Sequence, residues 1–397
     1  MISRGNFTDC VVIRSGTVIH PDPEQTRIRQ VLICRGSVSN DCPHEPAPID
    51  ASGCLVSPGL VDIHLHGALG HDLTEPDPAA WNQVLHAHLL AGTTTALATL
   101  ASTGPAETAA ALATAAELIA GRQTPTLAGV HLEGPCLAPE QRGAHDPAHL
   151  RSATQFLREL TPLPETLRMV TLAPELPGAD ELISYLVAQG VRVSAGHSSA
   201  TPEHLARARR LGLSHIAHLW SGQSTLTRPQ LHRLPGLLEA ALASDELTAE
   251  VIADGHHLPA ALLTIALRCL GPERLCLVSD ATAGTGLPPG TAFRTGASAG
   301  RVHAGYAATE DRTSLCGSVT PLAVTAARMR EMTGARVEDV LTMATATPAR
   351  AAGLYPRKGS LLPGADGDVV VLGPDLSVRA VVLGGRPITA PLAGGGR

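Results

Sequence analysis

Residues 61–67 read Val-Asp-Ile-His-Leu-His-Gly, and this stretch decides both the fold and the site. Its short apolar run predicts a buried β-strand. Alternate residues of a strand point to the same side, so we expect His64 and His66 to project together and to hold one ion. The stretch therefore predicts a strand that ends in two metal-type ligands.

The same kind of apolar run recurs along the chain, separated by Ala- and Leu-rich segments of helical length. Strands that alternate with helices indicate βαβ units, and eight of them fit a closed (β/α)₈ TIM-like barrel. A doubly wound open sheet is the structural alternative. The apolar runs lie near residues 60–66, 94–100, 127–133, 167–173, 192–197, 215–219, 250–254 and 274–280. The expected helices are 78–91, 105–121, 145–160, 179–190, 201–211, 234–247, 259–270 and 320–333.

Both ends of the chain read differently from this middle part. Residues 9–57 contain short β-branched runs punctuated by Gly and Pro, and the sequence beyond about 358 has the same character. Neither end is long enough to form a sheet alone. We therefore expect a small β-sandwich domain built from residues 1–57 and 358–397, beside a barrel of residues 58–357.

The bulk composition excludes several classes of function. The net charge is −6 without a long run of like charge, so nothing suggests binding to nucleic acid or to a membrane surface. The most apolar long window, residues 84–100, is too short and too polar to span a bilayer, and no secretory signal is apparent. The eight cysteines form no Cys-x-x-Cys pair, which favours free thiols in a cytoplasmic protein.

More metal-type side chains stand at the ends of other predicted strands. Glu133, His197, His218 and Asp280 each close an apolar run. The carboxyl ends of barrel strands converge on one face, so these side chains should meet His64 there. Imidazoles and carboxylates are ligands of a borderline divalent cation such as zinc. His215 competes with His218, and we choose His218 because it lies nearer the carboxyl end of its strand.

Each of these residues also has an ordinary interpretation. Glu133 and Asp280 could cap a helix or loop, and His197 could be a loop histidine. A second His-x-His pair, His86 and His88, falls on a predicted helix, where positions i and i+2 diverge, so we expect it on the helix surface. The ordinary interpretations are credible one at a time, but not together at five strand ends.

The chemistry of such a cluster is hydrolytic. A cation lowers the pKa of water toward neutrality, and Asp280 stands where a carboxylate could take the proton. The only lysine of the chain, Lys358, lies beyond the eighth strand. A carboxylated lysine that bridges two ions is therefore excluded, and Glu133 is the available bridging or anchoring carboxylate.

The order of motifs resembles the N-acetylglucosamine-6-phosphate deacetylases of the amidohydrolase superfamily. The resemblance covers nearly the whole chain. It is carried by Pro-Gly-Leu-Val-Asp-Ile-His-Leu-His-Gly at 58–67, His-Leu-Glu-Gly-Pro at 131–135, Gly-Ala-His-Asp-Pro at 143–147, Gly-His-Ser at 196–198, Ile-Ala-Asp-Gly-His-His at 252–257, Ser-Asp-Ala at 279–281, Gly-Leu-Pro at 286–288, Gly-Ser at 317–318 and Thr-Pro-Ala at 347–349.

The resemblance implies how a metal would be held. Glu133, His197 and His218 match the family's metal ligands, and the intact pair His64 and His66 implies a second ion. One or two divalent ions per subunit are therefore expected. Zinc is the first choice, with iron, manganese or cobalt as the alternatives.

The resemblance also implies roles around the substrate. Asp280 matches the residue that activates water and then protonates the leaving amine, and His145 matches the histidine that contacts the acetyl carbonyl. His257 and Arg233 match the residues that hold the sugar and its phosphate. In the family that arginine comes from a neighbouring subunit, which implies a homodimer.

The departures from the family pattern lie on the substrate side. Trp220 is followed by Ser221 and Gly222, where the family usually has Asn-Ala, and the loop up to Arg233 is longer and carries Arg228. Removal of the acetyl group from N-acetylglucosamine 6-phosphate is the expected reaction. The alternatives are a different or unphosphorylated N-acyl amino sugar or specialised metabolite, and a non-catalytic binding or scaffold relative.

Overall fold

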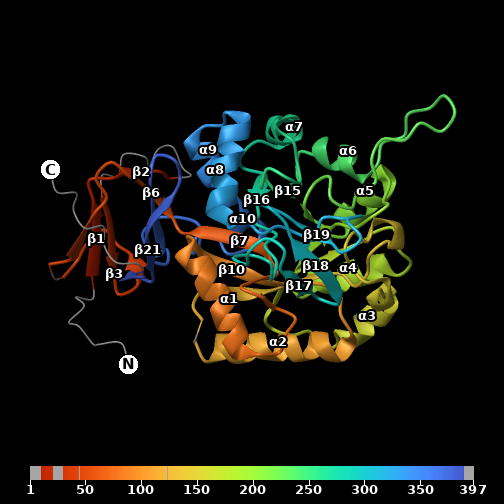
Figure 1. Cartoon of the computed structure of the whole chain (residues 1–397), viewed down its shortest axis with the longest axis horizontal. Helices are drawn as coiled ribbons and strands as arrows, with labels where there is room; N and C mark the ends of the chain where they lie inside the picture. Colours follow the sequence, from red (N-terminus) through yellow and green to blue (C-terminus); the bar gives the residue numbers. More distant parts are fainter. Residues whose placement is uncertain (1–9, 21–29, 44, 123, 389–397) are drawn as a thin grey trace.

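The computed structural model describes residues 10–20, 30–43, 45–122 and 124–388. It has two parts, a large barrel and a small β domain that contains both ends of the described chain (Figure 1). The parts of the expected small domain at 1–9, 21–29 and 389–397 lie outside the described residues.

The barrel is one parallel sheet in which each strand lies beside the next one in the sequence. This sequential order confirms the TIM-like barrel, and the doubly wound alternative is wrong. The ends of the sheet meet where the Asp280 amide donates to the His64 carbonyl at 2.9 Å and Leu65 bridges to Ala281. The strands are β7 (Leu60–Leu65), β10 (Thr93–Leu100), β11 (Leu127–Glu133), β12 (Leu167–Leu172), β13 (Arg192–Ala195), β14 (His215–Ile216), β15 (Thr248–Val251) and β16 (Leu275–Leu277).

Helices connect the strands and enclose the barrel (Figure 1). Most begin at a recognisable signal: α1 starts at Pro78, where the Asp77 carboxylate accepts from the Ala79 amide at 2.8 Å. The helices are α1 (Pro78–Leu90), α2 (Pro105–Ala120), α3 (Ala153–Glu159), α4 (Ala179–Ala188), α5 (Pro202–Arg210), α6 (Leu237–Leu242), α7 (Ala260–Leu270), α8 (Leu322–Thr333), α9 (Val337–Ala344) and α10 (Ala346–Ala351).

Two of the expected helices are shorter than predicted. The helix expected at 145–160 begins only at Ala153, because Ser152 caps it by accepting from the Gln155 amide at 3.3 Å. The helix expected at 234–247 is α6 alone, which starts after Gly236. Helices α9 and α10 were not predicted from the sequence. Two further unpredicted features are the hairpin of β8 (Gly67–Ala68) and β9 (His71–Asp72) and a three-stranded sheet of β17 (Ala292–Thr295), β18 (Ser298–Val302) and β19 (Ala307–Thr309).

The small domain is built from both termini, as predicted. Strands β6 and β20 pair in antiparallel fashion with Val56 opposite Val371, so the two ends of the chain share one sheet. Val11, Ile33 and Val369 belong to one buried apolar cluster between the two sheets. The first sheet contains β4 (Ser37–Val38), β3 (Gln30–Cys34), β1 (Cys10–Arg14) and β5 (Ala47–Asp50), and the second β2 (Thr17–Val18), β6 (Leu55–Pro58), β20 (Val369–Leu372), β21 (Val378–Leu383) and β22 (Arg386–Pro387).

The apolar core of the barrel has an inner and an outer layer. Val61, Ile63 and Met169 pack in the inner cluster, whereas Leu60 and Leu65 belong to the larger cluster that includes the helices. Ile63 and Leu65, the residues on either side of His64, are thereby fixed in the core, which holds the end of β7 rigidly. No helix within the described residues is long and apolar enough to cross a membrane.

The expectation that His86 and His88 form a helix-surface pair is wrong for His88. His86 is exposed, but His88 is 1% exposed and its Nε2 donates to the Gly67 carbonyl at 3.1 Å. Its position on α1, four residues after Val84, puts it on the buried face of the helix. Burial lowers the pKa of His88 to about 4, so it is a neutral core histidine.

Lys358 provides a test of the small domain. Its Nζ is paired with Asp368 at 2.6 Å and Asp366 at 2.9 Å, and its side chain is 14% exposed. Replacing Lys358 by Met leaves the buried Asp368 carboxylate without its cation, which should cost about 3 kcal/mol and lower the unfolding temperature by several degrees. Arg357→Met is the control: Arg357 pairs with the same Asp366 but is 78% exposed, so it should cost less than about 1 kcal/mol. Equal effects of the two variants in thermal denaturation would contradict this account.

Candidate active site

The buried carboxylate of Glu133, at the end of β11, is the centre of the site. Five imidazole Nε2 atoms surround it at hydrogen-bonding or slightly longer distances. The distances to Glu133 oxygens are 2.7 Å from His218, 3.0 Å from His197, 3.2 Å from His145 and 3.4 Å each from His64 and His66. The structure therefore brings together all of the predicted metal-type residues.

The hydrogen bonds of His197 and His218 fix the state of their rings. Nδ1 of His197 faces the Gln141 carbonyl at 2.8 Å, and Nδ1 of His218 faces the Ser221 carbonyl at 3.0 Å. A carbonyl can only accept, so each Nδ1 must carry the proton. In a neutral ring, Nε2 is then a lone pair that points at the Glu133 carboxylate. Two acceptors at this distance require a cation or a proton between them.

A divalent cation fits this donor set. Ring nitrogens directed by a second hydrogen bond, together with a carboxylate, are the usual arrangement around zinc and similar metals. Glu133 with His197 and His218 forms one candidate group, and Glu133 with His64 and His66 forms another. The histidines around Glu133 outweigh its burial and hold the pKa of its carboxyl well below the usual range.

Behind His64 lies a second carboxylate that the sequence analysis did not select. Glu250, on β15, is fully buried and accepts from His64 Nδ1 at 2.9 Å, so that Nε2 of His64 is the atom that faces Glu133. Glu250 also contacts His215 Nε2 at 3.1 Å and the His218 amide at 3.1 Å. The available signal was an acidic residue inside an apolar strand, which is costly unless it is paired.

The competition between His215 and His218 is also explained here. His218 contacts Glu133, whereas His215 is directed away to Glu250 and to the Thr248 hydroxyl at 2.6 Å. The choice of His218 as the residue that joins the cluster is consistent with this geometry. His131 is also buried, and its two ring nitrogens are hydrogen-bonded to the Ile63 carbonyl and the Thr171 hydroxyl.

Asp280 follows β16 and reaches the same cluster. Its Oδ1 lies 3.2 Å from His66 Nε2 and 3.7 Å from His64 Nε2. Although Asp280 is buried, the hydrogen bond from His66 and the neighbouring His64 lower the pKa of its carboxyl. The backbone at Asp280 is left-handed, with φ of +48°, as it is at His197 with φ of +47°. Such conformations are uncommon outside glycine, although Asp and His adopt them more often than most residues, and they concentrate at functional sites.

His145 has the opposite proton arrangement from His197. The Ser102 amide donates to its Nδ1 at 3.3 Å, so Nδ1 is an acceptor and Nε2 carries the proton. Burial lowers the pKa of His145 despite the nearby Glu133, which keeps the ring neutral. A neutral ring with its Nε2–H directed into the site is a hydrogen-bond donor for a carbonyl oxygen.

A cavity of about 350 Å³ opens beside this cluster. Its size and its mixed lining suit a small polar ligand. Among the residues that the structure describes, its lining includes no Lys or Arg. The predicted substrate-side residues Ser221, Gly222 and His257 line the cavity, with Trp220, Thr282, Thr295 and Ser298 also at its wall.

Gly222 is required by the packing of His197. A Cβ atom at position 222 would lie 2.7 Å from His197 Nδ1 and 2.8 Å from the Gln141 carbonyl, and the residue has φ of +74°. Only glycine meets both conditions. Gly222 therefore supports a ring of the cluster as well as lining the cavity.

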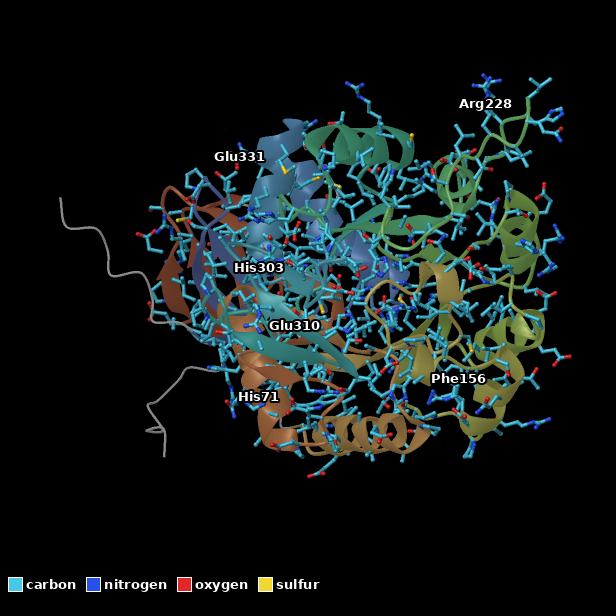
Figure 2. All side chains as sticks on the ribbon, turned by 45° about the vertical axis from the view of Figure 1, so that its right-hand side comes forward. His71, Phe156, Arg228, His303, Glu310 and Glu331 are labelled. Atoms are coloured by element: carbon cyan, nitrogen blue, oxygen red, sulfur yellow. The ribbon has the colours of Figure 1, made fainter. Side chains whose placement is uncertain are left out.

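Arg233 is not brought to this cavity within one chain. It lies exposed on a long loop, where its guanidinium donates to the Leu231 carbonyl at 3.4 Å. The loop projects from the barrel between α5 and α6, and Figure 2 shows Arg228 far out on it. Leu226, Leu231 and Leu234 are exposed on the same loop. Arg142 instead lines an adjoining wider hollow, which shares Gly143 and His145 with this cavity.

The chain is similar to proteins of known families. The model of the Amidohydrolase family matches residues 55–388, so the chain belongs to this family. N-acetylglucosamine-6-phosphate deacetylase of Bos taurus is 33% identical over 96% of this chain and 94% of its own length. Within the amidohydrolases, the chain therefore belongs to the N-acetylglucosamine-6-phosphate deacetylase family.

Other relatives extend this comparison. N-acetylgalactosamine-6-phosphate deacetylase of Escherichia coli O157:H7 is 32% identical over 86% of this chain and 90% of its own length. A solved structure of a Mycobacterium smegmatis N-acetyl-D-glucosamine-6-phosphate deacetylase mutant, in complex with N-acetyl-D-glucosamine-6-phosphate, superposes with a TM-score of 0.87 and 29% identity, covering 96% of this chain and 100% of that one. The chain is thus a hydrolase that acts on amide C–N bonds, and its superfamily is metal-dependent.

Glu250→Gln tests the role of the missed carboxylate. A neutral amide is a weaker acceptor for His64 Nδ1–H, so the variant should hold divalent metal about 10- to 100-fold less tightly, as measured by competition with a chelator. Glu239→Gln is the control, because Glu239 accepts from the Gly236 amide at the start of α6 and has no contact with the cluster. Unchanged metal affinity in Glu250→Gln would show that this carboxylate does not position His64.

Proposed function

We propose that this protein removes the acetyl group of N-acetylglucosamine 6-phosphate, giving glucosamine 6-phosphate and acetate. One observation carries the proposal: Glu133, His197 and His218 converge in a group that could hold a metal ion, beside a cavity that is also lined by Asp280. The similarity to deacetylases of amino sugar phosphates, over nearly the whole chain, supports this class of substrate.

In this proposal, Glu133, His197 and His218 hold one divalent ion, and His64 and His66 contribute to a second position. Zinc is the proposed metal because two or three imidazoles with a carboxylate are its common ligands. When bound, the ion supplies Lewis acidity, which polarises the amide carbonyl and lowers the pKa of water.

The side chains of the protein perform the proton transfers. We assign Asp280 as the general base, because its ionised carboxylate faces the cluster and can take a proton from the attacking water. The protonated Asp280 can then donate to the leaving amine. The Nε2–H of His145 is placed to donate to the carbonyl oxygen as negative charge develops on it. The roles of Ser221, Gly222 and His257 are to line the sugar subsite.

The phosphate needs a cation that the cavity of one chain does not supply. We propose that Arg233 of a second subunit provides it, in a homodimer, since the loop that carries Arg233 extends away from its own barrel. A planar guanidinium suits a phosphate dianion, and the only lysine of the chain is held in the small domain. We also propose a cytoplasmic location and domain boundaries at 1–57 with 358–397 and at 58–357.

Asp280→Asn tests the assignment of the general base. The amide cannot accept the proton, so we expect release of acetate from N-acetylglucosamine 6-phosphate to fall at least about 100-fold while bound metal stays at the wild-type level. Metal analysis of the same preparation is the control. Undiminished acetate release would refute the role of Asp280. If neither the wild-type protein nor the variant released acetate, the deacetylase proposal would be wrong and a non-catalytic relative would be favoured.

Arg233→Ala tests recognition of the phosphate. We expect kcat/KM to fall for N-acetylglucosamine 6-phosphate and for its galactosamine epimer, but not for unphosphorylated N-acetylglucosamine. Arg336→Ala, an exposed arginine whose side chain is 74% accessible on another face, is the control. A wild-type enzyme without preference for the phosphorylated sugar would favour the alternative substrate, an unphosphorylated N-acyl amino sugar.

The same variants test the contribution of the second subunit. Arg233→Ala and Asp280→Asn subunits, mixed and allowed to exchange, would form heterodimers in which one site has both residues. Activity should reappear on mixing if Arg233 acts across the interface. Its failure to reappear would place Arg233 in its own subunit's site or outside the reaction.

A further inference from the structure

Three of the eight cysteines meet at one end of the small β domain. Cys10 lies on β1, Cys34 on β3, and Cys42 in the loop after β4. Their sulfur atoms all lie within 4.8 Å of one another. None of the eight cysteines, all of which lie within the described residues, forms a disulfide, and the other five do not join a comparable group there.

The β-sheet itself fixes two of these thiols side by side. Cys10 and Cys34 are directly opposite partners in the antiparallel pair of β1 and β3. Directly opposite residues on one face of a sheet have their Cβ atoms close together. The thiol of Cys34 interacts with those of both Cys10 and Cys42, so it is the middle member of the group.

The core of the small domain does not account for these residues. Val11 and Ile33, their neighbours in sequence, belong to the apolar cluster between the two sheets, but Cys10 and Cys34 do not. Because side chains alternate along a strand, the two thiols project from the opposite, outer face of the sheet. Cys10 is nevertheless 1% exposed, so the thiol group is enclosed rather than scattered on the surface.

The loop that delivers Cys42 is held in place by its own hydrogen bonds. The Cys42 amide donates to the Asp41 carboxylate at 2.8 Å, and the Ser39 hydroxyl donates to the Asp41 carbonyl at 2.6 Å. The third sulfur is therefore presented to the other two from a structured turn. Cys34 and Cys42 are only partly buried, which gives an ion a path of entry.

We infer that Cys10, Cys34 and Cys42 form a binding site for a thiophilic metal cation, Zn²⁺ or Cu⁺, separate from the hydrolytic centre. Thiolates select these soft cations, and three of them supply a trigonal site or three positions of a tetrahedral one. Binding would release the thiol protons and tie β1, β3 and the following loop together. The site is on the small domain, whereas the barrel cluster has no cysteine ligand.

Cadmium distinguishes this site from the barrel cluster, because only thiolate ligands give an ultraviolet sulfur-to-cadmium charge-transfer band. We would load the full-length protein with zinc, keep it in a non-thiol reductant, and titrate it with Cd²⁺. The wild-type protein should develop the band and saturate at one equivalent. Cu⁺, added afterwards, should remove the band, because this softer cation displaces cadmium from thiolates.

Cys34→Ser should lose the band, and Cys269→Ser, which removes an exposed thiol elsewhere, should keep it. Cys42→Ser changes only a loop residue and should also lose the band, so the test does not depend on the folding of one variant. Deacetylation by each variant provides a check that the protein is folded. Absence of the band in the wild type, a band that survives in Cys34→Ser, or a band that Cu⁺ does not remove would overturn the inference.

Discussion

The structure depends on one electrostatic constraint, a buried carboxylate that faces imidazole lone pairs. Glu133 lies 2.7 Å from His218 and 3.0 Å from His197. Each of these rings carries its proton on Nδ1, which donates to a backbone carbonyl. The carboxylate and the two Nε2 atoms can therefore lie this close only if a positive charge lies among them. Burial makes this requirement strict, because water is not available to screen the lone pairs. A cation held at this position would polarise an amide carbonyl and lower the pKa of water, which suits the cluster to the hydrolysis of an amide.

The barrel satisfies this constraint by geometry rather than by local sequence. The clustered residues come from the ends of several strands, and the parallel register brings those ends to one face. The backbone conformation also contributes to the arrangement. Asp280 and His197 adopt left-handed conformations, and Gly222 leaves room for the His197 ring. Unfavourable backbone at these points is tolerable because the surrounding sheet and core hold it.

Much of this could be predicted from the sequence, since strand periodicity and residue chemistry are local signals. The eight apolar runs became the eight barrel strands, and the predicted site residues that close five of them meet around Glu133. An acid inside an apolar strand was a local signal for Glu250, but its partner His64 is distant in sequence, so the strand alone does not show what pairs with it. His88 was misplaced because the prediction rested on the divergence of positions i and i+2, whereas the spacing from Trp81 and Val84 puts position 88 on the buried face of α1. The three-stranded sheet of β17–β19 has short strands without a distinctive pattern, and it contributes Thr295 and Ser298 to the cavity wall.

The central claim is that Glu133, His197 and His218 share one divalent ion. Anomalous diffraction from crystals of protein purified without chelators, recorded at the absorption edge of zinc, tests it most directly. The account predicts a peak bonded to a Glu133 oxygen and to Nε2 of both histidines at about 2.0–2.2 Å. An ordered cluster without anomalous density, in crystals of a preparation that releases acetate, would contradict it.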